Sequence, residues 1–339
     1  MVFQFRDGTI IEDSVFIGDT EFFPVEALRS DEEAYESNFS AWLDQSWFPA
    51  QRDLLGEILS ISGNRKRYAD LSAAVSRRQA VPLVGSGMSV PSGLPTWSHL
   101  LRLVSGFTPV DPVSLEELIA DFSFEKAADL IAESTNVNML NERIEHELRV
   151  EASAEISGPV RLLPAIFPDL VVTTNLDDVL EYAYSLNGCS FEHVLAGQGI
   201  AKYRSIKALG QSLLLKLHGT CRDPEGRVLQ TKEYDHAYAE GGLIRDELAL
   251  LYRTHHLLFI GCSLGNDRTV ELVAEVASKD SNMPRHYAFL RLPDDSQVRI
   301  SREGFLSERN IYPIWYERPH DEALYALFTG LFDSASSGS

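Results

Sequence analysis

The sequence predicts an α/β protein built on a doubly wound parallel sheet, with a helical insertion and a small N-terminal accessory region. Short, almost entirely apolar runs recur along the chain, which is typical of parallel strands that are buried on both faces. Stretches with apolar residues at helical spacing separate most of these runs, as expected for a sheet covered by helices on both sides. The six predicted strands are residues 80–84, 169–174, 212–217, 256–261, 286–292 and 311–316.

The chain before the first of these strands has a different pattern. Residues 1–25 are predicted to form short strands, with Asp7-Gly8 as the turn of a hairpin between two alternating segments. Ser30 followed by Glu33 fits a capping box that opens a helix. This part of the sequence contains no chemical motif, so it is interpreted as an accessory region.

The length of 339 residues is sufficient for two lobes. A segment rich in Glu and Leu at helical spacing separates the first two predicted strands, and the chain ends in the small polar residues SASSGS. The predicted units are an accessory region at 1–62, a main α/β domain at 63–330 with a helical insertion at about 112–160, and a flexible tail at 331–339.

The charge balance argues against a large nucleic-acid interface. The chain has 30 Lys and Arg against 50 Asp and Glu, a formal net charge of −20, whereas nucleic-acid binding depends on cations that neutralise phosphates. No apolar run approaches the roughly 18 residues that a membrane helix needs, and the N-terminus lacks the basic and apolar regions of a secretory signal. A cytoplasmic protein without a membrane or nucleic-acid partner is therefore expected.

The cysteines and histidines do not form a metal motif. Cys189, Cys221 and Cys262 are isolated in the sequence, and no CxxC pair exists. His255 and His256 are adjacent, so in a strand they point to opposite faces. No metal site is predicted.

Small or polar residues follow each of the first four predicted strands. The carboxyl ends of parallel strands lie at one edge of a sheet, where ligands bind near the point at which the strand order reverses. We therefore expect these four loops to form one site. They begin at Gly85-Ser86-Gly87-Met88-Ser89, Thr173-Thr174-Asn175-Leu176-Asp177, His218-Gly219-Thr220 and Gly261-Cys262-Ser263-Leu264-Gly265.

The first loop resembles a phosphate-binding turn but lacks its usual partners. No lysine follows Gly85 and Gly87 as in a Walker motif, and Val90 stands where a dinucleotide fingerprint has its third glycine. The two glycines still allow close approach of a pyrophosphate, whose oxygens their N–H groups could face. A plain strand-to-helix turn is the alternative. Prolines at 91 and 95 predict a loop over 88–95, and Thr96 is a natural N-cap for the next helix.

The second and third loops supply candidate catalytic groups. The Asn175 amide cannot titrate, but it can orient a water or a ribose hydroxyl; a turn role is the alternative. Asp177 and Asp178 could cap the following helix, a role favoured for Asp178. His218 ends a strand, and with a pKa near neutrality it would suit proton transfer, although a structural histidine is equally compatible.

The fourth loop matches the GxSxG pattern of a nucleophile elbow, with Ser263 as the nucleophile. A serine hydrolase would also need His320 and one of Asp280, Asp294 or Asp295. No oxyanion glycine run lies upstream, and Asn175 and His218 would have no role, so this alternative is disfavoured.

Together, five segments of these loops resemble the motifs of the sirtuin superfamily, in the same order, over roughly residues 78–325. That family carries Gly-Ala-Gly-x-Ser, Ser-Gly-Ile-Pro-Asp-Phe, Thr-Gln-Asn-x-Asp, His-Gly and Gly-Thr-Ser. The matching segments here are Gly85-Ser86-Gly87-Met88-Ser89, Ser92-Gly93-Leu94-Pro95-Thr96-Trp97, Thr173-Thr174-Asn175-Leu176-Asp177, His218-Gly219 and Gly261-Cys262-Ser263. The resemblance implies a Rossmann-like fold.

The departures from the sirtuin pattern argue against protein deacylation. The four-cysteine zinc module is missing, Thr174 replaces the Gln beside the Asn, and Thr96 replaces the Asp of the Pro-Asp-Phe segment. The chain looks instead like the Sir2-like proteins of bacterial antiphage defence, which hydrolyse NAD⁺ to ADP-ribose and nicotinamide. No zinc is expected, and NAD⁺ would be the substrate.

The resemblance implies a role for each matching residue. Asn175 and His218 would be catalytic, with Asp177 beside them, and Trp97 is either a wall of the nicotinamide pocket or a core residue. The residues expected to bind NAD⁺ are Gly85, Ser86, Gly87, Ser89, Trp97, Thr174, Gly261, Ser263 and Asn266. A free NADase would kill its host, so regulation by homo-oligomerisation or by a defence partner, such as an ATPase or an Argonaute-type protein, is expected. A regulatory module that binds NAD⁺ or ADP-ribose without turnover is the alternative function.

Overall fold

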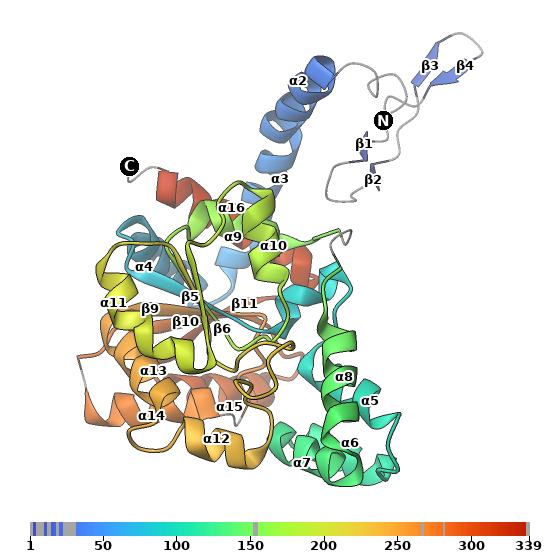
Figure 1. Cartoon of the computed structure of the whole chain (residues 1–339). Coiled ribbons are helices and arrows are strands. Elements are labelled where there is room, and N and C mark those ends of the chain that lie inside the picture. The colour runs from blue at the N-terminus through green and yellow to red at the C-terminus, as the bar shows by residue number, and fades with distance from the viewer. Residues whose placement is uncertain are drawn as a thin grey trace.

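The protein is a central parallel sheet with helices on both faces and a separate group of helices beside it (Figure 1). It is described here from a computed structural model. The described residues are 3–4, 10–11, 15–17, 20–22, 32–151, 155–265, 268–280 and 282–336.

The main sheet has seven strands, and every pairing between neighbours is parallel. In space the order is β11-β10-β9-β5-β6-β8-β7. This confirms the predicted Rossmann-like, doubly wound α/β fold. The strands are β5 (Ala80–Val84), β6 (Leu170–Thr173), β7 (His193–Ala196), β8 (Leu213–Lys216), β9 (His256–Ile260), β10 (His286–Arg291) and β11 (Ile311–Tyr316).

Strand β7 is the element that the sequence analysis missed. It lies at the edge of the sheet, and within the described part of the chain it pairs only with β8. Leu195 is buried, but Val194 is 44% exposed. An edge strand therefore lacks the continuous apolar run by which the six other strands were found.

The strand order reverses beside β5. The chain passes from β5 to β6 on one side, and after β8 it returns to place β9 on the other side of β5. Val84 at the end of β5 pairs with Ile260 at the end of β9 and with Thr173 at the end of β6. The loops that follow these strands consequently emerge together, at the position where parallel sheets bind ligands.

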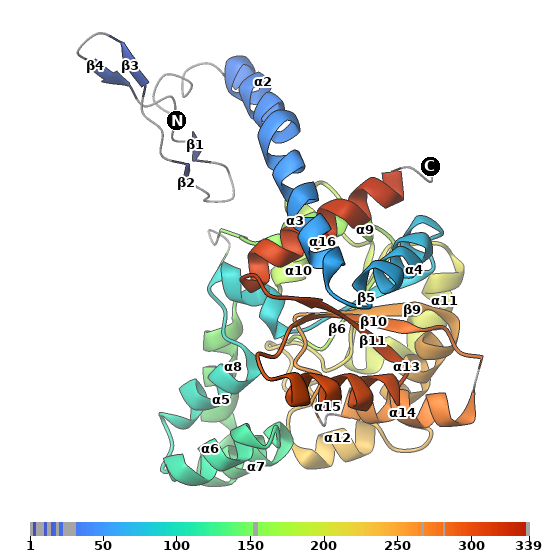
Figure 2. The same ribbon diagram turned by 180° about the vertical axis from the view of Figure 1, so that it is seen from behind.

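Alternate residues of each strand face two hydrophobic cores. Val81 and Leu83 face one core, while Ala80 and Val84 face the other. Helices on opposite faces of the sheet complete these cores, as the front and back views show (Figures 1 and 2). One face carries α3 (Phe48–Ser60), α4 (Asn64–Ser76), α9 (Leu163–Ile166), α10 (Val179–Leu186) and α16 (His320–Ser336). The other carries α11 (Tyr203–Ala208), α12 (Thr231–Ala237), α13 (Leu243–Thr254), α14 (Arg268–Lys279) and α15 (Ser296–Ser307).

A third core lies outside the sheet, within the group of helices between β5 and β6. These helices, which we call the helical lobe, are α5 (Trp97–Ser105), α6 (Pro112–Ala120), α7 (Phe124–Ser134) and α8 (Val137–Leu148). Their core includes Leu101, Ile119, Ile131 and Ile144. Helices α6 to α8 occupy the predicted insertion at 112–160, and α5 joins them because its buried face belongs to the same core.

The N-terminal part begins with two short antiparallel strand pairs. They are β1 (Phe3–Gln4) with β2 (Ile10–Ile11), and β3 (Val15–Ile17) with β4 (Thr20–Phe22). The predicted strands are therefore present, while the Asp7-Gly8 turn and Ser30 lie outside the described residues.

A continuous helical run follows these strands. It comprises α2 (Glu32–Trp42), a π-helical turn η1 (Leu43–Trp47) and α3. Leu54 and Ile58 of α3 belong to the same core as Leu71 of α4. The predicted boundary at residue 62 therefore crosses a continuous core and does not separate two packing units.

The predicted flexible tail at 331–339 also needs correction. Helix α16 continues to Ser336, and Leu331 is fully buried. Leu324, Leu327 and Leu331 share one face of the helix at spacings of three and four residues, which packs that face on the sheet. Residues 337–339 lie outside the described part of the chain.

The side chain of Asn64 connects the start of α4 to strand β11. Its Nδ2 atom donates to the carbonyl oxygens of Ile58 and Trp315 at 2.7 Å each, and its Oδ1 atom accepts from the Trp315 N–H at 3.0 Å. Asn64 is fully buried. These bonds satisfy backbone groups that water does not reach.

We expect Asn64→Ala to lower the free energy of unfolding by about 2–4 kcal/mol, because three buried hydrogen bonds lose their partner. Urea denaturation of both proteins measures the change. Asn138→Ala, at an exposed position of α8, serves as the matched control and should change stability by less than about 0.5 kcal/mol. Equal effects of the two substitutions would contradict the structural role of Asn64.

Candidate functional site

A cavity of about 1060 Å³, including its open mouth, lies at the carboxyl ends of β5, β6, β8 and β9. The helical lobe forms its other wall through Phe122, Phe124 and Leu148. The four loops singled out in the sequence therefore meet at one site. Nine of the twelve predicted site residues line it: Gly85, Ser86, Trp97, Thr174, Asn175, Asp177, His218, Gly261 and Ser263.

Three glycines bring two loops into direct contact below the cavity. A Cβ atom on Gly85 would lie 2.5 Å from the carbonyl oxygen of Gly261, and one on Gly87 would lie 2.9 Å from the Gly261 Cα. Gly261 has a φ of 68°, in the left-handed region that favours glycine. These positions therefore need glycine because the two backbones pack against each other.

The backbone donors of this turn are already used. The Gly85 N–H donates to the Ile260 carbonyl at 2.8 Å, and the Gly87 N–H donates to the Gly261 carbonyl at 3.0 Å. The expectation that these two N–H groups face a pyrophosphate is therefore wrong. Their hydrogen bonds hold the two loops together, and Gly87 does not line the cavity.

The stretch after this turn differs from the expected loop over 88–95. Residues Ser86–Ser92 form a 3₁₀ helix that ends at Gly93, whose φ is 84°. A 3₁₀ turn tolerates Pro91 in place of an α-helical donor. Thr96 then caps α5 as predicted, because its side-chain oxygen accepts from the His99 N–H. The hydroxyl of Ser86 accepts from the Trp97 N–H at 3.2 Å and ties α5 to the rim of the cavity.

Asn175, Ser89 and Asp177 form a buried chain of hydrogen bonds. Asn175 Nδ2 donates to Ser89 Oγ at 3.2 Å, and the Ser89 hydroxyl donates to Asp177 Oδ2 at 2.9 Å. Ser89 is only 1% exposed and does not line the cavity. It therefore does not face a ligand as expected, but fixes the orientation of the Asn175 carboxamide.

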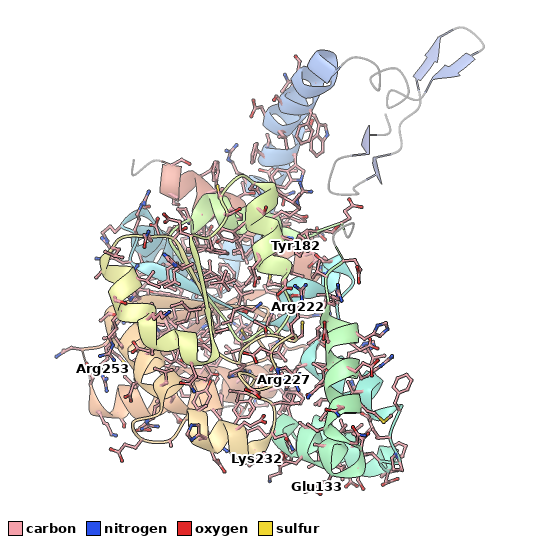
Figure 3. All side chains as sticks on the ribbon, viewed as in Figure 1. Glu133, Tyr182, Arg222, Arg227, Lys232 and Arg253 are labelled. Atoms are coloured by element: carbon pink, nitrogen blue, oxygen red, sulfur yellow. The ribbon has the colours of Figure 1, made fainter. Side chains whose placement is uncertain are left out.

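The cap of helix α10 is also different from the prediction. The carboxylate of Asp177, not that of Asp178, accepts the N–H of Val179 at 3.0 Å. Asp178 instead forms an ion pair with Arg222 at 2.8 Å. Figure 3 labels Arg222 and Arg227 on the loop after β8, on the side that faces α8. The Asp178 carboxylate pairs with Arg222 and Lys216 and makes no cap hydrogen bond to α10.

A buried lysine lies beneath the same loop. Lys216 is the last residue of β8 and is fully buried; its Nζ donates to the Asp177 carbonyl at 2.6 Å and to Glu181 at 2.8 Å. Burial acts to lower the pKa of Lys216, but the carboxylates of Glu181 and Asp178 outweigh it, so the pKa is raised. Burial raises the pKa of Asp177.

His218 lies in the wall of the cavity between two tyrosines of the α12 region. Its Nε2 atom is 2.9 Å from the Tyr238 hydroxyl, and its Nδ1 atom is 3.4 Å from the Tyr234 hydroxyl. Burial lowers the pKa of His218 to about 4, so the expectation of a value near neutrality is wrong. The imidazole is neutral at pH 7, and the tyrosines orient its donor and acceptor nitrogens.

The residues proposed for a serine hydrolase are not brought together. Ser263 is exposed at the cavity, while His320 lies at the start of α16 and bonds to the Tyr316 hydroxyl. His320 is not among the residues that line the cavity. The first glycine of the GxSxG match, Gly261, therefore serves the contact between the loop after β9 and Gly85.

Several residues of the site were missed by the sequence analysis. Tyr234 lines the cavity, and so do Arg268 and Glu125, which form an ion pair at 3.0 Å. Glu125 belongs to the helical lobe, so no local pattern connects it with Arg268. The predicted residue Asn266 lies outside the described residues.

Residues 169–314 match the family model of the SIR2-like domain. The match runs from the start of β6 into β11 and contains Asn175, His218 and Ser263. The match agrees with the resemblance of the sequence motifs to the sirtuin superfamily. The match supports an NAD-related function.

Two further observations concern metals and membranes. Among the residues that the structure describes, no group of three or more His, Cys, Asp or Glu side chains is placed to hold a metal ion. Within the same residues, no helix has the length and hydropathy required to span a bilayer.

The depressed pKa of His218 predicts a pH dependence of stability. The imidazole stays neutral in the folded protein down to about pH 4, whereas in the unfolded chain it becomes protonated below about pH 6.5. Its contribution to stability is therefore present above pH 6.5 and is lost as the pH falls toward 4. His218→Gln should reduce the loss of unfolding free energy between pH 7 and pH 5 by about 2 kcal/mol.

Urea denaturation at both pH values measures this difference. The control is His99→Gln, because His99 is exposed on α5. His286, fully buried with a pKa of about 3, contributes to the same pH dependence and remains in both variants. An unchanged pH dependence in His218→Gln would show that His218 titrates normally in the folded protein.

Proposed function

We propose that the protein is an NAD⁺ glycohydrolase that cleaves the bond between nicotinamide and ribose to give ADP-ribose and nicotinamide. The observation that carries this proposal is the convergence of Asn175, Asp177 and His218 on one cavity at the reversal point of a SIR2-like sheet. A rigid carboxamide and a neutral imidazole can position a ribose and a water, and neither requires a metal.

The shape and lining of the cavity support a dinucleotide as substrate. The cavity extends from the loops after β5, β6, β8 and β9 to the facing side of the helical lobe. Apolar side chains, among them Trp97, Phe122 and Phe124, supply flat surfaces on which rings can stack. Ser86, Thr174, Asn175 and Ser263 supply polar groups from the loops after the strands.

The reaction needs little acid catalysis. The bond between ribose C1′ and the nicotinamide nitrogen breaks through an oxocarbenium-like transition state, as in other glycosyl transfers. The electron pair remains on the nicotinamide nitrogen and cancels its positive charge. A water oxygen bonds to C1′, and one of its protons is transferred to a base, so the products are ADP-ribose, nicotinamide and a proton.

His218 is proposed as the acceptor of that proton, from the attacking water or from a ribose hydroxyl. Its low pKa keeps it neutral at pH 7, so a nitrogen lone pair is present. Because an imidazole with this pKa is a weak base, the transfer would follow formation of the bond from oxygen to C1′, which makes the proton acidic. Tyr238 would stabilise the protonated ring by accepting from Nε2.

Asn175 is proposed to orient the ribose and the water. Ser89 holds its amide nitrogen, so the oxygen of the same carboxamide is the atom that would accept from a hydroxyl or a water. Asp177 fixes the Ser89 hydroxyl in turn by accepting its hydrogen bond. No zinc is required for any of these steps.

We further propose an abortive-infection role in antiphage defence, in the cytoplasm, with activation by homo-oligomerisation or by a partner protein such as an ATPase or an Argonaute-type protein. The resemblance to Sir2-like defence proteins supports this role. Uncontrolled NAD⁺ cleavage would harm the host cell, so basal activity of the isolated chain is expected to be low.

We expect Asn175→Ala and His218→Ala each to reduce nicotinamide release from NAD⁺ by at least about 100-fold, because each removes a group that acts at the reaction centre. Chromatography of the products measures the release, with and without candidate partner proteins. Asn138→Ala and His99→Ala change the same residue types at exposed positions and should retain activity.

Three outcomes would contradict this assignment. Full activity in both site variants would show that catalysis occurs elsewhere. Binding of NAD⁺ or ADP-ribose without turnover under every trigger would instead support a regulatory nucleotide-binding module. Covalent labelling of Ser263 by a fluorophosphonate would support a serine hydrolase.

Ser89→Ala tests the positioning role of the buried chain. We expect kcat for NAD⁺ cleavage to fall by about 10- to 100-fold with KM changed less than threefold, because the substituted chain leaves Asn175 unoriented without altering the cavity wall. Ser89→Thr, which keeps the hydroxyl, should recover part of kcat if the larger side chain is accommodated. A change in KM alone would contradict a positioning role.

A further inference from the structure

Arg268 occupies a distinctive position in the cavity wall. It is the first residue of α14, and among the described residues that line the cavity it is the one Lys or Arg. Its side chain is 30% exposed. An anionic ligand in this cavity would therefore find its cationic partner at Arg268.

Two carboxylates already neutralise this guanidinium. Glu125 accepts from Nε at 3.0 Å and from Nη2 at 3.0 Å, using both of its oxygens, and Asp235 accepts from Nη2 at 2.7 Å. Glu125 lines the cavity and is 22% exposed, whereas Asp235 is 61% exposed and lies outside the lining. The bidentate pairing with Glu125 is the one formed within the cavity.

Few other groups in the cavity wall could bind a diphosphate. The N–H groups of Gly85 and Gly87 donate to the loop after β9. The imidazole of His218 is neutral, and Asp177 contributes a further carboxylate to the lining. A diphosphate and the Glu125 carboxylate would therefore compete for one guanidinium, and they would repel each other if both were present.

We propose that Glu125 is a gate carboxylate for the diphosphate of the substrate: it occupies Arg268 in the unliganded protein, and the bound dinucleotide replaces it. This inference rests on the proposed NAD⁺ site and deepens it. Arg268 is accordingly a substrate-binding residue, and Glu125 sets how readily it is available.

The position of Glu125 in the helical lobe connects this exchange to the lobe. Helix α7 carries Glu125 and also Asp129, which accepts from the Thr231 N–H at 3.2 Å at the start of α12. Replacement of Glu125 by a diphosphate breaks the contact of α7 with Arg268 and leaves the contact of Asp129 with α12 in place. An activator that shifts α7 would release Arg268 in the same way, so the pair is suited to control the affinity for substrate.

Isothermal titration calorimetry with ADP-ribose tests the proposal without requiring turnover. Glu125→Gln keeps the size of the side chain but removes its charge, and we expect it to bind ADP-ribose at least about fivefold more tightly than the wild type. Asp235→Asn makes the same charge change at the same guanidinium outside the cavity, and it should alter the affinity less than twofold. Arg268→Gln should weaken binding at least about tenfold.

Two further measurements test whether the gain in affinity depends on the diphosphate and on Arg268. Adenosine lacks it, so its affinity should be the same in Glu125→Gln and in the wild type. In the double variant Glu125→Gln/Arg268→Gln, the gain from Glu125→Gln should disappear, because the two residues act through one contact. Circular dichroism and thermal unfolding of each variant verify that it is folded.

Failure of the gate proposal and failure of the proposed function give different results. If the wild type binds ADP-ribose but Glu125→Gln binds no more tightly, or if Asp235→Asn gives an equal gain, the gate is wrong while the NAD⁺ site stands. If neither the wild type nor any variant binds ADP-ribose or cleaves NAD⁺, the proposed function itself is wrong, and the gate with it.

Discussion

The contact between the loops after β5 and β9 is the constraint on which the rest of the site depends. The backbones at Gly85, Gly87 and Gly261 lie so close that a Cβ atom at any of the three would clash. Hydrogen bonds from Gly85 to Ile260 and from Gly87 to Gly261 hold this contact. This contact positions the Ser86–Ser92 turn next to the cavity, where the Ser89 hydroxyl accepts a hydrogen bond from Asn175.

Buried charged groups hold the loop after β6, which carries Asn175 and Asp177. Lys216 holds the backbone of Asp177 from below, and its charge is balanced by Asp178 and Glu181. Asp177 is thereby fixed where it caps α10 and accepts from Ser89. Because every one of these groups is removed from most of the solvent, displacement of one leaves an unpaired charge or donor, and the arrangement is rigid.

Residues that directly follow a buried strand were predictable. Asn175, His218 and Ser263 each lie within three residues of a strand end, so their place at the carboxyl edge follows from the apolar runs alone. Edge and terminal elements were harder to predict. Strand β7 lacks a second buried neighbour, and the last turns of α16 carry their apolar residues within a segment that ends in small polar residues.

Partners that are remote in the sequence could not be predicted. Glu125 and Arg268 are separated by 143 positions, and Ser89 and Asp177 by 88. No periodicity relates such pairs, since their contact depends on how the helical lobe and the loops pack. The same packing decides that Ser89 is buried and that the glycine N–H groups are not available to a ligand.

The sequence by itself determined the parallel sheet, the edge at which the site lies and the polar residues that reach the site directly after the strands. These follow from burial patterns and from the residues next to each strand, which are local properties of the chain. Only the tertiary structure decided which donors remain for a ligand, the low pKa of His218 and the pairing of Arg268 with Glu125. Hydrogen bonding, desolvation and ion pairing depend on distances between elements that no local pattern contains.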